Sequence, residues 1–236
     1  MAQKKLKRFN AIKGFSNVLE YPEGMPGKWN DFFGNRNPIV LELACGKGEY
    51  AVGLAKMHPS VNCIGVDLKG NRIYIGARKC LEEKIENAAF LRTQIDMISA
   101  YFAKAEVREI WLTFPDPQLR KSRIKKRLTH PKFLRLYQQI LVPGGLIHLK
   151  TDSPVLYDFT RLVIEMYGLI LHKHSDNAYA DLPDKEELQI RTHYEALDIA
   201  RSKRVHYLCF SLPDSDLPQI DPALKQRIKQ DEQAIG

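Results

Sequence analysis

With 236 residues, 44% of them hydrophobic and 27% charged, the chain has an ordinary globular composition, which excludes a fibrous or mostly disordered protein. Its formal net charge of +8 favours a polyanionic partner such as a nucleic acid. No apolar run approaches the roughly 18 residues of a membrane helix and residues 1–10 lack the core of a signal peptide, so we expect a cytoplasmic protein with no membrane partner.

The predicted elements begin with a flexible basic arm over residues 1–27, where apolar periodicity is weak and the turn residues YPEGMPG end the stretch. Short apolar runs then predict buried parallel strands at residues 39–44, 62–67, 88–93, 109–114 and 145–152. Helical segments are expected between them, at residues 49–57, 70–86, 96–103, 130–141 and 153–167. This alternation predicts an α/β domain over residues 28–212, with a doubly wound, mostly parallel sheet.

The alternation stops after this point. Apolar runs at residues 169–175 and 205–212 predict two more strands, and the long polar passage between them contains no strong helix before the last strand. A strand reached by so long a passage could insert antiparallel between earlier strands. Residues 213–236 are polar and contain prolines, so we expect a tail that forms a strap or a short surface helix.

A glycine loop follows the first strand of the predicted domain, in LELACGKGEY. Gly46 and Gly48 allow a tight turn and a close approach to a ligand, and with Ala51 they satisfy the G-x-G-x-x-A dinucleotide fingerprint. Asp67 lies 21 residues beyond Gly46, at the spacing expected for an acid that binds ribose hydroxyls. A nicotinamide dinucleotide and S-adenosylmethionine both carry a ribose, so this loop leaves both open, beside the plainer interpretation of a simple turn and a surface acid.

Further acids distinguish the two cofactors. Glu42 lies in the first of these strands, Asp96 follows the third and Asp116 follows the fourth, so with Asp67 we expect four carboxylates at the carboxyl edge of the sheet. Such a group would repel a pyrophosphate and attract a cationic sulfonium. The pattern therefore favours S-adenosylmethionine.

The stretch FPDPQLRKSRIKKRLTHP places Asp116 between two prolines, which restrict the backbone around its carboxylate. Six cations then occupy eight positions: Arg120, Lys121, Arg123, Lys125, Lys126 and Arg127. A basic run inside a domain and next to a ligand edge is suited to binding phosphates. If about four of these cations pair with phosphate, the logarithm of the affinity should fall with the logarithm of the salt concentration with a slope of about −3 to −4.

Five motifs now occur in order over residues 39–211: LELACGKGEY, GVD, FPDP with its basic run and RLTHPKFL, LKTD, and THYE. In this arrangement the chain resembles the bacterial tRNA (guanine-N7)-methyltransferase family. The resemblance implies a Rossmann-like class I methyltransferase sheet of seven strands with the last antiparallel. It also implies tRNA as the partner and methyl transfer from S-adenosylmethionine to the variable-loop guanosine conventionally numbered 46.

The same resemblance implies roles for individual residues. Asp116 would be catalytic. The cofactor would be bound by Glu42, Gly46, Gly48, Asp67, Asp96 and Asp116. The guanosine side would be formed by Arg120, Asp152, Thr192, His193, Tyr194 and Glu195, and RNA would be contacted by Ser122, Arg123, Ile124, Lys125, Lys126 and Arg127. The chain departs from the family pattern at Ala44, where glycine is common, and at Gln118, Leu119 and Arg120, where tryptophan, proline and lysine are usual.

The remaining expectations are less specific. The four cysteines show no C-x-x-C pairing and three lie in apolar runs, so we expect buried, reduced thiols and no metal. Another class I methyltransferase acting on RNA, a nicotinamide-dependent reductase and a non-catalytic RNA-binding module stay open as alternatives. The protein is expected to be a monomer or a homodimer.

Overall fold

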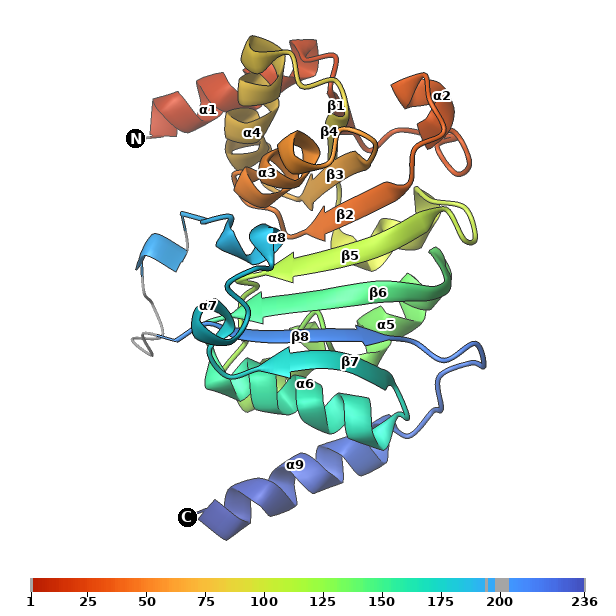
Figure 1. The fold of residues 1–236 in the computed structure, drawn as a ribbon, viewed down its shortest axis with the longest axis vertical. Coiled ribbons are helices and arrows are strands. Elements are labelled where there is room, and N and C mark those ends of the chain that lie inside the picture. The colour runs from red at the N-terminus through yellow and green to blue at the C-terminus, as the bar shows by residue number, and fades with distance from the viewer. Residues whose placement is uncertain (1, 194, 198–203, 236) are drawn as a thin grey trace.

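A computed structural model describes residues 2–193, 195–197 and 204–235 (Figure 1). Within these residues one sheet has the strand order β1-β4-β3-β2-β5-β6-β8-β7. The strands are β1 (Val18–Glu20), β2 (Ile39–Leu43), β3 (Asn62–Asp67), β4 (Ala88–Arg92), β5 (Val107–Thr113), β6 (Leu141–Thr151), β7 (Ile170–Ser175) and β8 (His206–Ser211).

The predicted fold class is confirmed. Strands β1 to β6 pair in parallel, whereas β8 lies between β6 and β7 and pairs antiparallel with both. All seven expected strands are present. The described sheet has one strand more, because β1 pairs with β4 at the edge, on the N-terminal side of the expected start of the domain.

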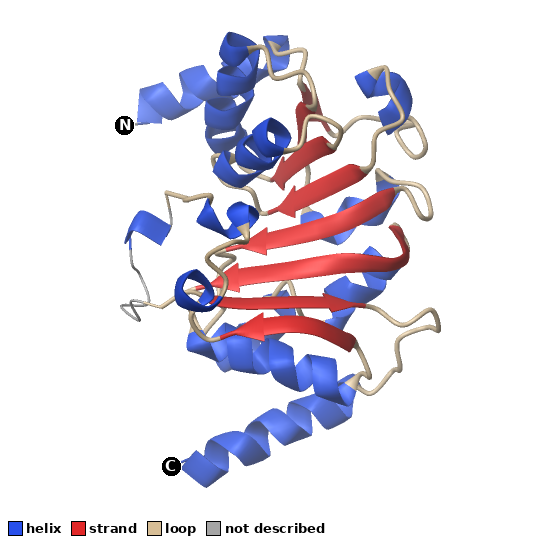
Figure 2. Cartoon of the chain, in the orientation of Figure 1, coloured by secondary structure: helices blue, strands red, loops and turns tan. Residues whose placement is uncertain are grey.

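Helices connect these strands (Figure 2). They are α1 (Ala2–Ala11), α2 (Trp29–Phe33), α3 (Glu49–Met57), α4 (Gly70–Glu83), α5 (Pro131–Gln138), α6 (Pro154–Met166), α7 (Ala178–Asp181), α8 (Glu186–Gln189) and α9 (Asp221–Ile235). Four 3₁₀ segments are η1 (Ile12–Gly14), η2 (Ile95–Ala100), η3 (Lys121–Lys126) and η4 (Glu195–Leu197). The helix expected at residues 96–103 is the short 3₁₀ segment η2. The stretch expected to form a flexible arm contains α1 and β1, and the expected tail contains α9.

Local sequence explains where the two longer helices after β5 begin. Proline occupies the first position of both α5 and α6, where a missing N–H costs nothing. Ser153 Oγ caps α6 by accepting a hydrogen bond from the Leu156 amide, and His130 Nδ1 accepts one from the Lys132 amide at the start of α5.

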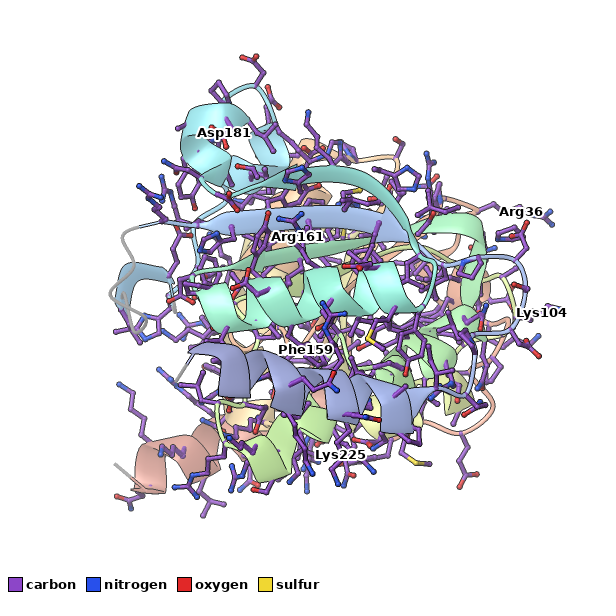
Figure 3. The ribbon with its side chains drawn as sticks, turned by 90° about the horizontal axis from the view of Figure 1, so that it is seen from below. Arg36, Lys104, Phe159, Arg161, Asp181 and Lys225 are labelled. Carbon is purple, nitrogen blue, oxygen red and sulfur yellow. The ribbon has the colours of Figure 1, made fainter. Side chains whose placement is uncertain are left out.

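Two apolar clusters fill the two faces of the sheet. One lies under α5, α6 and α9, and it includes Phe133, Val163 and Leu224 with strand residues such as Leu41 and Leu43. Figure 3 looks along the molecule and shows α6 and α9 side by side on this face. The other cluster joins α3, α4 and α8 to strand residues that alternate with the first set, such as Val40 and Trp111. Glu42 lies two positions after Val40 in β2, so its side chain points to the same face of the sheet, the one covered by α3.

The four cysteines, Cys45, Cys63, Cys80 and Cys209, are free and buried, as predicted. In the parts of the chain that the structure describes, no helix has both the length and the apolar character needed to cross a membrane.

Candidate active site

The glycine loop and Asp67 lie together at the carboxyl edge of the sheet. Asp67 Oδ2 accepts a hydrogen bond of 2.9 Å from the Gly46 amide, and Oδ1 accepts one of 2.8 Å from the Lys69 amide. Gly46 and Gly48 have φ angles of 57° and 73°, in the left-handed region that favours glycine. Ala44 also adopts a φ of 58°, which explains why glycine suits this position in related sequences. The loop is thus fixed by backbone bonds to Asp67.

Glu42 is buried beneath the same loop. Its two carboxyl oxygens accept hydrogen bonds from the Ala51 amide of α3 at 2.8 Å and from Thr113 Oγ1 at 2.7 Å. Burial raises the pKa of Glu42 to about 8, with smaller upward contributions from Glu49 and Asp67. At pH 7 this carboxyl is therefore largely protonated, and the negative charge expected from it is largely missing. Attraction for a cation rests on the other acids of this edge.

Asp96 makes its contacts elsewhere, whereas Asp67 bonds to the glycine loop and Glu42 to α3. Its side chain is half exposed and forms an ion pair with Lys132 Nζ of α5. The topology brings the strand ends to one edge. Glu42 and Asp67 are close enough there for Asp67 to raise the pKa of Glu42, whereas Asp96 is paired with Lys132. Within the residues that the structure describes, no group of three or more His, Cys, Asp or Glu side chains could hold a metal ion.

Asp116 lies in an exposed loop after β5. Its Oδ1 accepts a hydrogen bond of 2.9 Å from the Gln118 amide, which fixes the direction of the carboxylate. Phe114 and Gln118 on either side have φ angles of 46° and 47°, which are strained for residues other than glycine. Strain of this kind persists only where the surroundings hold it in place, so the loop has a defined shape.

The basic segment after Asp116 forms η3, in which residues three apart share a face. Ser122, Arg123, Lys125 and Lys126 are exposed. Ile124 packs against the core under α5, and Arg127 is only 5% exposed. Arg127 Nε donates a hydrogen bond of 3.0 Å to the Pro117 carbonyl, and its guanidinium lies over the Phe159 ring. Arg120 is exposed at the start of the segment.

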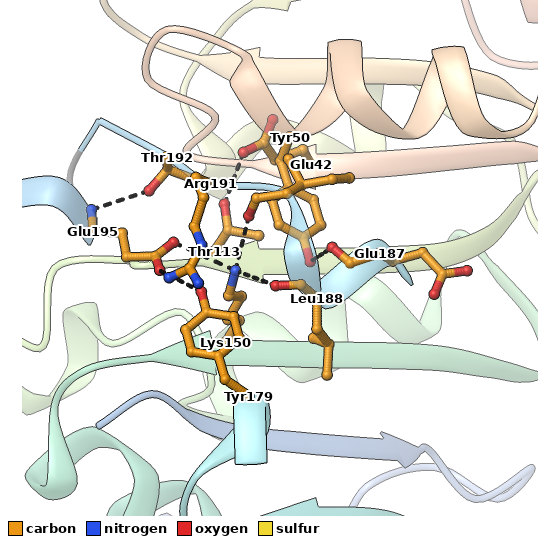
Figure 4. Close-up of polar contacts among 11 residues, drawn as sticks. Glu42, Tyr50, Thr113, Lys150, Tyr179, Glu187, Leu188, Arg191, Thr192 and Glu195 are labelled. Carbon is orange, nitrogen blue, oxygen red and sulfur yellow. Dashed lines mark hydrogen bonds and ion pairs between the residues drawn. The ribbon is translucent and has the colours of Figure 1, made fainter. Parts of the chain in front are cut away.

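The passage between β7 and β8 returns the THYE segment to the sheet (Figure 4). Thr192 is buried, and its Oγ1 accepts a hydrogen bond of 3.1 Å from the Glu195 amide. The Glu195 carboxylate accepts hydrogen bonds from Tyr179 Oη of α7 and from Arg191 Nη1, and its Oε2 lies 3.5 Å from Lys150 Nζ of β6. Asp152 is half-buried directly after β6, and His193 is exposed. Tyr194 lies outside the described residues.

Sequence reasoning did not single out three side chains of this cluster. Lys150 is fully buried. In the sequence it is only a single lysine at the end of the apolar strand run GLIHLKTD, and this did not mark it as part of the site. Arg191 directly precedes THYE, but one exposed arginine next to a motif is common. Tyr179 lies in the polar passage, where nothing in the sequence marks it.

Comparisons with known proteins show the family of the chain. The family model described as "Putative methyltransferase" matches residues 36–208. The chain is 45% identical to the tRNA (guanine-N(7)-)-methyltransferase of Porphyromonas gingivalis, covering 91% of this chain and 92% of that protein. It is 43% identical to the enzyme of the same name from Bacteroides thetaiotaomicron, covering 93% and 90%.

Solved structures that resemble this one are more distant and show the fold alone. The 16S rRNA methyltransferase KamB has a TM-score of 0.59 at 15% identity, covering 79% of this chain and 93% of that chain. A 16S rRNA (adenine(1408)-N(1))-methyltransferase from Catenulisporales acidiphilia, solved with its cosubstrate SAM, has a TM-score of 0.53 at 14% identity, covering 82% and 93%. The fold is that of the class I methyltransferases, and the similarity to the curated relatives spans nearly the whole chain. The chain belongs to the tRNA (guanine-N7)-methyltransferase family.

Proposed function

We propose that this chain transfers the methyl group of S-adenosylmethionine to N7 of guanosine 46 in the variable loop of tRNA. One observation carries the proposal: Lys150 of β6 lies beside both the Phe114 ring, which begins the Asp116 loop, and the Glu195 carboxylate of the late segment. The glycine loop opens α3, and Tyr50 of α3 also borders Lys150. The glycine-loop helix, the start of the Asp116 loop and the late segment thus meet around Lys150, which supports the proposal. Family membership supports the reaction.

The first loop suits the nucleoside part of the cofactor. Each Asp67 oxygen accepts one backbone N–H and retains a lone pair that could accept from a ribose hydroxyl. We assign the cofactor to Glu42, Gly46, Gly48, Asp67, Asp96 and Asp116. When bound, S-adenosylmethionine supplies an electrophilic methyl group on a sulfonium. A cation placed near Glu42 would favour the ionised form of this buried carboxyl.

The chain's own residues have a limited chemical task. Guanine N7 carries a lone pair and no proton, so no general base is needed. The protein must align the base and stabilise the positive charge that develops on the guanine ring. We assign this role to Asp116, whose fixed but exposed carboxylate can accept hydrogen bonds from the guanine N1–H and amino group. Arg120, Asp152, Thr192, His193, Tyr194 and Glu195 are assigned to the guanosine side.

The RNA chain itself requires a different kind of contact. We assign phosphate binding to Ser122, Arg123, Lys125 and Lys126, which are exposed in η3. Ile124 and Arg127 support the same segment from below. The target base must leave its stacked position to reach the edge of the sheet, at a cost of a few kcal/mol.

Radiolabelled S-adenosylmethionine and unmodified tRNA test the proposal directly. We expect label in the tRNA, located at N7 of guanosine 46 by nuclease digestion and by chain cleavage at 7-methylguanosine, and no label in a tRNA with adenosine at that position. Label at another base would indicate a different RNA methyltransferase. Retention of RNA without label would indicate a binding module, and either result would overturn the proposal.

The Asp116→Ala variant tests the assigned catalytic residue. Loss of its carboxylate removes stabilisation of the guanine cation, so we expect kcat to fall by about 100- to 1000-fold while the Kd for tRNA changes little. The matched control is Asp31→Ala, which removes an exposed carboxylate of α2 and should leave kcat unchanged. An Asp116→Ala variant that keeps its kcat would remove this residue from the mechanism.

A further inference from the structure

Lys150 is a charged side chain at the centre of a sheet. It lies in β6 with no exposed surface, where an unpaired ammonium would be very costly. Its Nζ donates hydrogen bonds of 2.8 Å to the Leu188 carbonyl and 2.9 Å to the Ile190 carbonyl, and it lies 3.5 Å from Glu195 Oε2. The three N–H groups of the ammonium thus face three acceptors.

Aromatic rings enclose the same ammonium. The Tyr50 ring of α3 lies 5.4 Å from Nζ, the Tyr179 ring of α7 5.1 Å and the Phe114 ring 5.5 Å. Each is within the range at which the face of a ring attracts a cation. The rings come from three separate segments, so the ammonium is a shared contact of the glycine-loop helix, the Asp116 loop and the late passage. Figure 4 shows the Tyr50 and Tyr179 side chains next to Lys150.

All three acceptors of Lys150 belong to the passage between β7 and β8. Leu188 lies in α8, Ile190 follows it, and Glu195 begins η4. The same passage is tied to α3 at one further point, where Tyr50 Oη donates to the Glu187 carbonyl at 2.5 Å. Within the passage, the Arg191 guanidinium stacks 3.8 Å from the Tyr179 ring. Lys150 is therefore one of the contacts that join this passage to the body of the sheet, and among the described residues it alone reaches Leu188, Ile190 and Glu195 together.

We propose that Lys150 is a positioning residue, which never touches the substrate but fixes Thr192 and Glu195 in their working place through its three acceptors. The significance of that place rests on the proposed function, because both residues are assigned to the guanosine side. The anchoring by Lys150 does not rest on the proposed function, since the anchoring contacts lie within the free protein.

The charge on Lys150 helps to hold the Glu195 carboxylate, beside the hydrogen bonds from Tyr179 and Arg191. Desolvation lowers the pKa of Lys150 to about 8. The Glu195 carboxylate raises the pKa of Lys150 and so opposes this change, whereas Arg191 lowers it further. Tyr50 and Tyr179 face the ammonium as neutral phenols, because burial raises their own pKa values. A neutral amine has only two N–H groups. Above pH 8 the side chain can still donate to both carbonyls, but its bond to the Glu195 carboxylate is lost.

The test compares Lys150→Met with Lys150→Arg and with a matched control, Lys185→Met. Lys185 lies in the same passage, and its ammonium contacts only the rings of Trp111 and Tyr207 among the interactions described for it. Hydrogen exchange is measured on the free proteins over residues 186–193, and steady-state kinetics with tRNA and S-adenosylmethionine follow. Circular dichroism confirms that each variant is folded.

In Lys150→Met we expect exchange over residues 186–193 to accelerate at least about tenfold, because the anchoring bonds are gone. We expect kcat with tRNA to fall about 100-fold through misplacement of the segment, while the KM for S-adenosylmethionine is unchanged. Lys150→Arg should recover part of both effects. We expect the kcat/KM of the wild type to decline above pH 8, and Lys150→Arg should lack this decline. Lys185→Met should match the wild type.

The possible failures are distinct. Wild-type exchange in Lys150→Met would overturn the anchoring, and fast exchange with an unchanged kcat would overturn the positioning role. A wild type that transfers no methyl to tRNA would overturn the proposed function, while the exchange experiment would still decide the anchoring. If Lys150→Met does not fold, Glu195→Gln gives the same exchange measurement, because it removes the charged acceptor and leaves the lysine buried.

Discussion

At the scale of single residues, Gly48 controls the shape of the glycine loop. Its φ of 73° disfavours any side chain, and a Cβ there would lie 2.4 Å from Phe90 Cε1. Gly48→Ala therefore combines backbone strain of about 1–2 kcal/mol with overpacking of about 1–3 kcal/mol. We expect the free energy of unfolding to fall by about 2–5 kcal/mol in urea denaturation, with weaker cofactor binding in calorimetry.

Gly34→Ala is the matched control for this effect. Gly34 has a φ of 65°, but nothing lies within 4 Å of the position of its Cβ. It should therefore show the backbone strain alone, about 1–2 kcal/mol. Equal losses in the two variants would show that contact with Phe90 is unimportant.

Arg127 and Lys126 are neighbours with opposite surroundings. Arg127 is buried against Phe159 and bonded to the Pro117 carbonyl, whereas Lys126 is exposed. Arg127→Gln should lower the free energy of unfolding by about 1–3 kcal/mol, because the buried carbonyl loses a charged donor. It should also lower kcat, because Pro117 adjoins Asp116, and should change the Kd for tRNA little. Lys126→Gln should weaken tRNA binding and leave kcat and stability unchanged. Filter binding and steady-state kinetics measure both. Weaker tRNA binding in Arg127→Gln together with a lower kcat in Lys126→Gln would contradict these roles.

At the scale of elements, α9 is fixed to the domain by its first residue. Asp221 accepts hydrogen bonds from both terminal nitrogens of Arg135 in α5, at 2.6 Å and 3.1 Å, and one of 2.7 Å from Tyr167 Oη. Leu217 and Leu224, on either side, are buried in the same face of the sheet. These contacts make the C-terminal helix part of the core, and Figure 3 shows it lying along α6.

Asp221→Asn should therefore loosen α9. The Arg135 guanidinium lowers the pKa of Asp221 to about 2, so its stabilising contribution is present above about pH 4 and is lost as the pH falls through about 2. We expect the variant to lose about 1–2 kcal/mol of unfolding free energy at pH 7 and to approach the wild type in strong acid. Asp216→Asn, which changes an exposed carboxylate of the same connection, is the control and should show no such convergence.

Some elements could not be predicted from sequence. β1 has three half-buried residues and pairs only at the sheet edge, so no apolar run marks it. Over residues 120–127 the sequence shows six similar cations, and only the folded structure separates Arg127, buried directly after η3, from its exposed neighbours. The helices α7 and α8 have four residues each and are held by tertiary contacts with Tyr50 and Lys150.

At the scale of the whole molecule, periodicity predicted the parallel sheet and the edge where the strand ends meet. The antiparallel last strand was expected from the long passage before it and from the family resemblance, and periodicity did not indicate it. The charge state at that edge was not predictable, because the pKa of Glu42 depends on burial and on its bonds to Thr113 and Ala51. The Lys150 cluster was hidden for the same reason. It joins residues up to 145 positions apart, from Tyr50 to Glu195, and only the folded chain brings them together.

The net charge of +8 raises the question of whether tRNA is attracted by the whole surface or by η3. If η3 contacts phosphates, the double variant Lys125→Gln with Lys126→Gln should bind tRNA with a weaker dependence on salt. The slope of the logarithm of the affinity against the logarithm of the salt concentration should become shallower by about 1.5, because fewer counterions are released when two phosphate contacts are lost. The matched control is Lys225→Gln with Lys229→Gln, which removes two exposed cations from α9, a helix at one end of the molecule (Figure 1). It lowers the net charge equally but should leave the slope unchanged. Filter binding across a salt series measures both, and equal changes in the two double variants would show that the attraction is diffuse and that η3 is not the phosphate contact.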